Sequence, residues 1–183
     1  MPGRSAMPGR IAPSIPFRPL RIAVLTVSDT RSAADDRSGD TLAERIAADG
    51  HELAARAIVR DEAGLIARQL REWIAAPAVE IVITTGGTGV TGRDVTPEAL
   101  DRVAQKKIPG FGELFRMLSY PKIGTSALQS RAAAGVADGT YIFCLPGSPG
   151  ACRDGWDDIL RSQLDIRHKP CNFAELLPRL RER

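Results

Sequence analysis

The sequence has few of the residues that build metal clusters and disulfide frameworks. Its three cysteines are Cys144, Cys152 and Cys171, its only histidines are His51 and His168, and no Cys-x-x-Cys pair occurs. An odd number of widely spaced cysteines argues against a disulfide framework and against zinc-site spacings. Neither histidine lies in a motif that would pair it with a serine or cysteine nucleophile. The expected chemistry therefore does not use a protein nucleophile.

Long apolar runs and aromatic residues are also scarce. No stretch approaches the roughly 20 apolar residues of a membrane span, and the first residues lack the apolar run of a secretory signal. We therefore expect a cytoplasmic protein that does not bind membranes. Aromatic residues make up 5% of the chain, so Ala, Ile, Leu and Val must form most of the core.

Charge of one sign is not concentrated in the body of the chain. The formal net charge is +3, and residues 1–19 contain Arg4, Arg10 and Arg18 but no acid. Three of the 25 basic residues lie in that segment, so the rest of the chain carries 22 basic and 22 acidic residues. A nucleic-acid surface needs a clustered basic stripe. No such run follows residue 19, and we do not expect nucleic-acid binding.

The first 19 residues are rich in Pro, Gly, Ala and Arg and show no periodicity. Such a segment buries too little apolar surface to offset the entropy lost on ordering. We predict a disordered N-terminal arm over residues 1–19, without a role in ligand affinity or oligomer size. Residues 20–183 are predicted to form one domain, since the length suits one core.

From Arg21 onward, short β-branched runs alternate with helical patterns. This order is typical of βαβ units around a mainly parallel sheet that is covered on both faces. The predicted strands are residues 22–27, 54–60, 79–85 and 140–145. Ser38, Asp61 and Thr96 are the predicted N-caps of three of the helices between them. The predicted fold is a three-layer αβα sandwich with a mainly parallel central sheet.

The glycine-rich segment 86–92, directly after the strand 79–85, is where the sequence predicts binding chemistry. Glycines let backbone N–H groups approach an anion without interference from Cβ atoms, and the hydroxyls of Thr85, Thr88 and Thr91 add donors. Pro97 suits the first position of the next helix, whose positive dipole end would lie beside the same loop. We expect a phosphate or carboxylate to bind here.

Two common phosphate motifs do not explain this loop. Residues 87–92 match G-x-G-x-x-G, but the helix begins only after the third glycine and no acidic strand end follows about 20 residues later. No Gly-Lys-Ser/Thr sequence closes the loop either, so it is not of the Walker type.

Asp94 lies where its carboxylate would repel a bound anion unless a cation lay between them. Mg²⁺ commonly binds one or two carboxylates together with substrate phosphate oxygens, so Asp94 and Asp61 fit a phosphoryl- or nucleotidyl-transfer site. The alternative is that Asp94 only accepts hydrogen bonds from loop amides and that Asp61 only caps its helix. The residues alone leave both interpretations open.

A second Gly/Pro loop, residues 146–150, follows the predicted strand 140–145. Two strand-loop-helix units with small residues at their carboxyl ends predict a crevice along one edge of the sheet, where open α/β folds bind ligands. The alternative for each loop alone is a tight βα turn.

In order and spacing, these motifs resemble the MoaB/MogA family of molybdenum-cofactor proteins, and more closely its MoaB branch. The resemblance covers the chain from about Arg21 to Leu164. It implies a molybdopterin-binding-domain-like fold, assembly as a homotrimer or hexamer, and binding of molybdopterin, a pterin that bears a dithiolene and a terminal phosphate. The matching segments are residues 84–89, 93–99, 109–113, 130–131 and 145–149.

The resemblance also implies an activity and its residues. Active members use Mg-ATP to adenylylate the molybdopterin phosphate, and a partner such as the metal insertase then uses the product. Asp61 and Asp94 would be the catalytic residues and would hold Mg²⁺, which favours an enzyme over the alternative, a non-catalytic molybdopterin carrier or scaffold. The residues predicted to bind the pterin, its phosphate or the nucleotide are Thr85, Gly86, Gly87, Thr88, Gly89, Glu98, Glu113, Ser130, Pro146, Gly147, Ser148 and Pro149.

Overall fold

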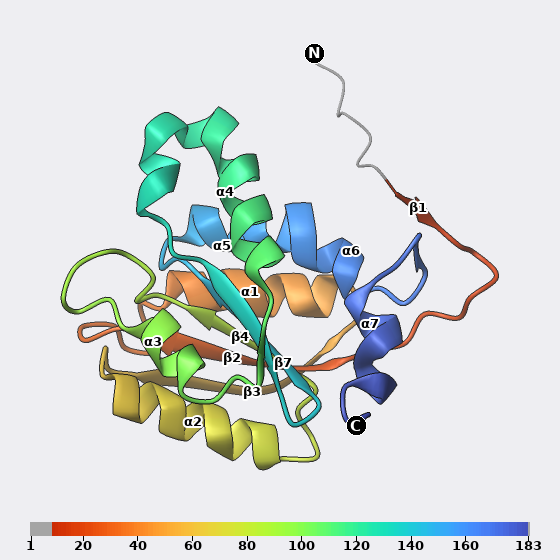
Figure 1. Ribbon diagram of the computed structural model, residues 1–183, viewed down its shortest axis with the longest axis horizontal. Helices are drawn as coiled ribbons and strands as arrows, with labels where there is room; N and C mark the ends of the chain where they lie inside the picture. The colour runs from red at the N-terminus through yellow and green to blue at the C-terminus, as the bar shows by residue number, and fades with distance from the viewer. Residues whose placement is uncertain (1–8, 183) are drawn as a thin grey trace.

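Four adjacent parallel strands form most of a six-stranded sheet in the computed structural model, which describes residues 9–182 (Figure 1). The strand order is β3-β2-β4-β7-β6-β5. The last two strands run antiparallel to their neighbours. The bounds are β2 Arg21–Val27, β3 Glu52–Val59, β4 Ile81–Thr85, β5 Lys106–Lys107, β6 Ala133–Ala137 and β7 Thr140–Leu145.

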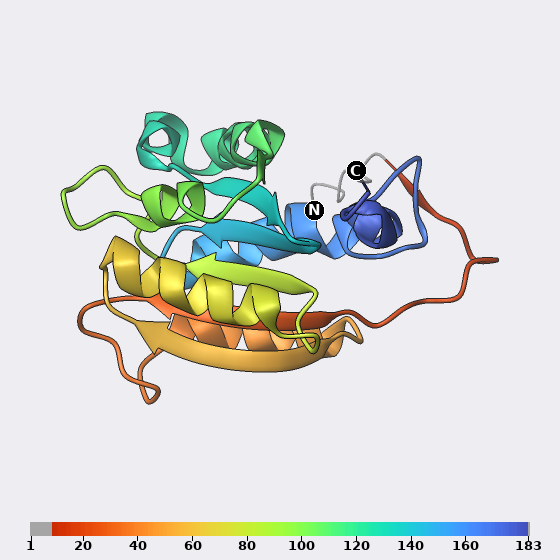
Figure 2. The same ribbon diagram turned by 60° about the horizontal axis from the view of Figure 1, so that its bottom comes forward.

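Helices cover both faces of this sheet, as Figure 2 shows. Successive residues of a strand point to opposite faces, so Val24 of β2 packs in one core with Leu42, while Leu25 packs in the other with Leu70. The predicted three-layer α/β sandwich is thus confirmed. On the first face lie α1 Arg37–Ala48, α4 Pro109–Ile123 and α5 Pro149–Gly155, and on the second α2 Ala63–Ala75 and α3 Thr96–Asp101.

Shorter elements complete the chain. A 3-10 helix follows α4, and a π-helical segment continues α5. No helix within residues 9–182 is long and apolar enough to cross a membrane. The bounds are β1 Arg10–Ile11, η1 Gly124–Gln129, η2 Trp156–Leu160, α6 Arg161–Gln163, β8 His168–Lys169, α7 Phe173–Leu176 and η3 Leu177–Arg179.

The predicted N-cap of α1 is wrong. The helix begins at Arg37, and its N-cap is Asp36, whose carboxylate accepts a hydrogen bond from the amide of Gly39 at 3.0 Å. Ser38 instead donates its hydroxyl to the carbonyl oxygen of Gly147 at 2.7 Å. Asp36 also accepts from the hydroxyl of Thr26 at 2.7 Å, so the true cap ties the helix start to the sheet.

The other two predicted N-caps also serve elsewhere. The N-cap of α2 is Glu62 rather than Asp61, and the N-cap of α3 is Val95 rather than Thr96, which is the first helical residue. The hydroxyl of Thr96 donates to the carbonyl oxygen of Gly86 at 2.8 Å. Asp61 and Thr96 both lie beside Gly87 of the glycine loop. Contacts with this loop, and not helix capping, therefore decide the conformations of their side chains.

The N-terminal arm is ordered over residues 9–19, which corrects the predicted disorder there. Arg10 and Ile11 form β1 and pair antiparallel with β8. The Phe17 ring lies 5.1 Å from the His51 ring, centroid to centroid, and the guanidinium of Arg167 lies 5.0 Å from the Phe17 centroid. Contacts with a distant part of the chain thus offset the entropy cost that the sequence indicated. Residues 1–8 of the predicted arm lie outside the described residues.

Candidate functional site

The loops that follow β2, β4 and β7 meet at the carboxyl edge of the parallel strands. The amide of Gly86 donates to the carbonyl oxygen of Leu145 at 3.0 Å, and the hydroxyl of Thr85 donates to that of Pro146 at 2.9 Å. From the first loop, Arg31 donates to the carbonyl oxygen of Gly147 at 2.6 Å. The two glycine loops therefore lie side by side, as their positions in the sequence predict.

Main-chain contacts leave no room for a side chain at Gly86 and little at Gly147. Gly86 has a φ of +105°, and a Cβ atom there would lie 2.2 Å from the carbonyl oxygen of Val27. A Cβ atom on Gly147 would lie 3.2 Å from the Cα of Gly86. At Gly87, where φ is +67°, a Cβ atom would lie 2.3 Å from the Thr96 hydroxyl oxygen. The cradle is therefore built of backbone, as an anion-binding loop requires.

A cavity of about 400 Å³ opens beside these loops. Its size suits a small-molecule ligand. Of the residues predicted to bind ligand or metal, those that line it are Thr88, Gly89, Asp94, Ser130, Pro146, Gly147 and Ser148. The predicted residues outside the lining are Asp61, Thr85, Gly86, Gly87, Glu98, Glu113 and Pro149.

The opposite wall of the cavity comes from α4, η1 and α5, which lie next to one another in Figure 1. Lys122 of α4 contacts Asp154 at 2.8 Å and Asp158 at 2.7 Å through its Nζ atom. Burial opposes the charge on Lys122, but the two carboxylates keep its pKa above the usual value. This wall, which sequence analysis missed, therefore offers a cation within a salt-bridge network. Its lining residues are Phe115, Ser119, Lys122, Ile123, Ser126, Gln129, Gly150, Ala151 and Asp154.

Asp61 lies against the glycine loop with its negative charge uncompensated. A Cβ atom on Gly87 would be 3.2 Å from its Oδ1 atom. Burial raises the pKa of Asp61, and the negative charges of Asp29 and Asp94 add to the increase. The positive charge of Arg93 opposes this increase only in part, because Arg93 forms its ion pair with Asp29. A cation bound beside Asp61 would offset the surrounding negative charge.

Asp94 is more strongly hydrogen-bonded than Asp61. Its Oδ2 atom accepts from the Thr91 hydroxyl at 2.7 Å and from the Thr91 amide at 3.0 Å. Burial opposes ionisation, but these hydrogen bonds and that from the Gly89 amide outweigh it and place the pKa of Asp94 below its usual value. The alternative that Asp94 binds loop amides is thus realised, although Asp94 also lines the cavity. Asp61 does not have the capping role considered for it, because Glu62 is the N-cap of α2.

The donor set fits a magnesium ion that arrives with a nucleotide. Within residues 9–182, no three His, Cys, Asp or Glu side chains gather closely enough to hold a metal ion by themselves. Mg²⁺ bound to ATP needs only one or two protein carboxylates, because phosphate oxygens and water complete its coordination. Asp61 and Asp94, on either side of the loop, provide that number.

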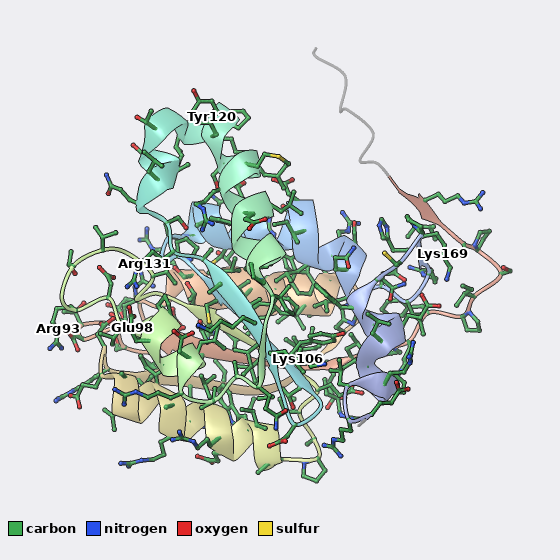
Figure 3. The ribbon with its side chains drawn as sticks, viewed as in Figure 1. Arg93, Glu98, Lys106, Tyr120, Arg131 and Lys169 are labelled. Carbon is green, nitrogen blue, oxygen red and sulfur yellow. The ribbon has the colours of Figure 1, made fainter. Side chains whose placement is uncertain are left out.

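Arg131 fixes the glycine loop from outside the cavity. Its Nε atom donates to the carbonyl oxygen of Gly89 at 2.7 Å, and a terminal nitrogen donates to that of Asp94, also at 2.7 Å. The other terminal nitrogen pairs with Glu98, and Figure 3 shows the two side chains close together. Glu98 therefore holds Arg131 rather than lining the cavity, and Glu113 is an exposed residue of α4. Sequence analysis missed the role of Arg131.

The buried thiol nearest the loops is not a nucleophile. Cys152 lies 3.1 Å from the hydroxyl oxygen of Thr85, and burial raises its pKa to about 11. The thiol is therefore neutral at physiological pH. The arrangement supports chemistry by positioning and charge rather than by covalent catalysis.

The chain is similar to known proteins over most of its length. A family described as "Probable molybdopterin binding domain" matches residues 23–166. Molybdenum cofactor biosynthesis protein B of Escherichia coli K12 is 50% identical over 160 residues, which is 87% of this chain and 94% of that protein. The family match over residues 23–166 includes both glycine loops and Arg131.

Solved structures show the same fold. A crystal structure of a molybdenum cofactor biosynthesis protein B superposes with a TM-score of 0.82 and 36% identity, covering 91% of this chain and 98% of the other. The tungsten cofactor synthesizing protein MoaB from Pyrococcus furiosus gives a TM-score of 0.74 and 31% identity, covering 90% of this chain and 99% of the other.

Proposed function

The chain belongs to the MoaB/MogA family of molybdenum cofactor biosynthesis proteins, and we propose that it binds molybdopterin in the cavity and adenylylates its terminal phosphate with Mg-ATP. The observation that carries this proposal is the position of Asp61 and Asp94 on either side of a backbone-built anion cradle. Anion binding alone gains nothing from two acids at the cradle. Two acids are useful where a cation and several phosphates must meet.

The proposed reaction requires positioning more than covalent help. A phosphate oxygen of molybdopterin forms a bond to the α-phosphorus of ATP, and the bond from that phosphorus to the departing pyrophosphate breaks. The amides of Gly87 and Thr88 would hold phosphate oxygens, because those of Gly86 and Gly89 already donate to Leu145 and Asp94. Lys122, which pairs with Asp154 and Asp158, lies on the opposite wall of the cavity. Such fixed donors and charges are effective because they need no reorganisation during the reaction.

Asp61 and Asp94 would hold magnesium, which would neutralise the charge that collects as the molybdopterin phosphate approaches the three phosphates of ATP. Asp61 suits this role because its negative charge is unpaired. Asp94 has a second role, since its hydrogen bonds with Thr91 close the loop. Loss of the Asp94 charge alone, with its hydrogen-bonding oxygen retained, would therefore separate the two roles.

The test is to mix the protein with molybdopterin, Mg²⁺ and α-labelled ATP and to follow label in the pterin together with released pyrophosphate. We expect transfer by the wild type and loss of transfer in Asp61→Asn and Asp94→Asn, both folded by circular dichroism. Asp101→Asn is the matched control, because its carboxylate pairs with Lys107 at the surface. Normal transfer by a well-folded Asp94→Asn protein contradicts the assignment. Tight pterin binding without transfer by the wild type favours a carrier or scaffold.

The family resemblance also supports a homotrimer or hexamer that acts in the cytoplasm and passes its product to a metal insertase. One observation favours self-association: α4 and η1 expose the apolar side chains of Met117, Ile123 and Leu128. Figure 3 shows Tyr120 at the outer end of α4, where this helix and η1 stand out from the sheet. Sedimentation equilibrium measures the mass directly, and a monomer at micromolar concentration contradicts this part of the proposal.

A further inference from the structure

A second hollow lies at the opposite edge of the sheet, where β2, β4 and β7 begin. Its volume is about 590 Å³. The end of α2, the turn between β6 and β7 and the segment after α7 enclose it, and Figure 1 shows these segments together at the edge away from the glycine loops. Three arginines line it, Arg18, Arg21 and Arg181. We call it the arginine hollow.

Positive charge in the arginine hollow exceeds negative charge. Glu80 is the one acid among its lining residues, and it contacts both Arg18, at 2.5 Å, and Arg21, at 3.5 Å. Arg181 donates through Nε only to the backbone carbonyl of Asp138, at 3.0 Å. One carboxylate thus faces three guanidinium groups.

Arg21 has an unused donor at this place. Its Nε atom is buried and has no hydrogen-bond partner within the described residues. The terminal nitrogen reaches the carbonyl oxygen of Pro77 at 3.4 Å, which is a long contact. A buried donor without a partner costs free energy, and that cost would be removed if the Arg21 side chain turned its guanidinium toward an acceptor bound in the arginine hollow.

A neighbouring recess extends the positive surface. It shares Ile74, Ala75 and Arg181 with the arginine hollow and adds Arg71 and Arg102. Arg71 donates to the backbone carbonyl of Arg102 at 3.2 Å, and the carboxylate of Asp138 accepts from the side-chain amide of Gln105 at 2.6 Å. Five arginines therefore surround two joined recesses that contain two acids, Glu80 and Asp138. Such a cluster repels itself unless an anion is bound.

We propose that the arginine hollow is a second ligand site and that it binds a diphosphate group, either as free pyrophosphate or as the phosphate chain of a nucleotide. Planar guanidinium groups match phosphate oxygens in pairs, and a multivalent anion suits an excess of positive charge. The lining also contains the apolar residues Ile74, Val79 and Leu177, although Val79 and Leu177 are mostly buried in the core. A concave recess of this size, unlike an extended basic stripe, does not follow a nucleic-acid backbone.

Arginine footprinting locates the site. The full-length protein is treated with phenylglyoxal with and without pyrophosphate, and modified peptides are quantified by mass spectrometry. We expect pyrophosphate to protect Arg18, Arg21 and Arg181, and to leave the exposed Arg68 of α2 reactive as a control. Protection confined to Arg31, Arg93 and Arg131 would place the anion at the glycine loops and overturn the proposal, as would no protection at all.

Calorimetry then tests the residues and the source of the phosphate. In Arg18→Gln/Arg181→Gln, removal of two charged donors is expected to weaken pyrophosphate binding about tenfold or more, whereas Arg68→Gln binds like the wild type. Unchanged affinity in the double variant overturns the proposal. Tighter binding of α,β-methylene-ATP than of pyrophosphate, lost in the double variant, identifies a nucleotide; equal affinities identify the diphosphate alone. Asp94 does not line the arginine hollow, so Asp94→Asn should bind pyrophosphate there like the wild type. A failure of the proposed adenylyl transfer can therefore be told apart from a failure of this second site.

Discussion

The guanidinium of Arg131 donates to the carbonyl oxygen of Gly89 across 2.7 Å, and the Arg131 amide donates to the carbonyl oxygen of Thr88 at 2.8 Å. A residue just before β6 therefore holds two successive carbonyl groups of the loop that follows β4. The loop is fixed before a ligand binds, which reduces the ordering cost of binding.

Replacement of Arg131 by lysine is expected to loosen this loop while the fold remains. A lysine ammonium cannot contact Gly89, Asp94 and Glu98 in the geometry of a planar guanidinium. We expect molybdopterin affinity to fall about tenfold, measured by equilibrium binding, with a native circular dichroism spectrum. Arg68→Lys, on an exposed face of α2, is the control. Wild-type affinity in Arg131→Lys would mean that the loop does not need this contact.

Replacement of Asp36 by alanine is expected to lower the free energy of unfolding by about 3 kcal/mol at pH 7. The fully buried Asp36 carboxylate pairs with Arg56 at 2.8 Å and accepts from Thr26, so its removal leaves both without that partner. Burial opposes ionisation, but the hydrogen bonds from Arg56 and Thr26 lower the pKa of Asp36.

The effect of Asp36 has a defined pH dependence. Because its folded pKa is lowered, its contribution is present above the unfolded value of about 3.9 and is lost as the pH falls through the folded value. Urea unfolding of wild type and Asp36→Ala should therefore differ at pH 7 and converge at the acid end. Asp40→Ala, which removes the half-exposed partner of Arg56, should cost less than about 1 kcal/mol. An equal loss in both variants would contradict the argument.

Asp61→Asn is expected to stabilise the protein at neutral pH while abolishing label transfer. The folded pKa of Asp61 is raised, so the ionised form is less favourable in the folded state than in the unfolded chain. That penalty is fully present above the folded pKa and disappears below the unfolded pKa of about 3.9. Thermal unfolding should show a higher Tm for Asp61→Asn at pH 7 and no difference below pH 4. A lower Tm at pH 7 would contradict the assigned repulsion.

Phe17→Ala is expected to destabilise the protein by about 1 to 2 kcal/mol without changing molybdopterin affinity. The ring packs against His51 and beneath Arg167, far from the glycine loops in sequence and on the side where β1 meets β8. Urea unfolding and equilibrium binding measure the two quantities separately. A large loss of affinity would show that the arm acts on the cavity.

The central strands were predictable because they are buried on both faces, which gives uniform apolar runs such as residues 140–145. The strand β6, toward the antiparallel edge of the sheet, could not be predicted in the same way. The Ala-rich β6 has weak strand propensity and contains Gly135. Its one signal is Asp138-Gly139, which has φ values of 44° and 85° and forms the two-residue turn to β7.

The two glycine loops could be predicted because their chemistry is local in the sequence. The wall formed by α4 and η1 could not, since its contact with the loops depends on how the helices pack. The arginine hollow is the extreme case, because Arg18 and Arg181 come from opposite ends of the described chain. Basic and acidic residues are equal in number after residue 19, so the composition gave no indication of this local excess of positive charge.

The main-chain contact between Gly86 and Gly147 has a consequence for how such a protein can diversify. Beside the cavity, the two glycine loops pack main chain against main chain, which leaves no room for a side chain at Gly86 and little at Gly147. The facing wall is set by side chains such as Phe115, Ser119 and Gln129, which can be exchanged singly. New ligand preferences can therefore arise on the helical wall by point mutation, while the packing of the two glycine loops against each other is retained.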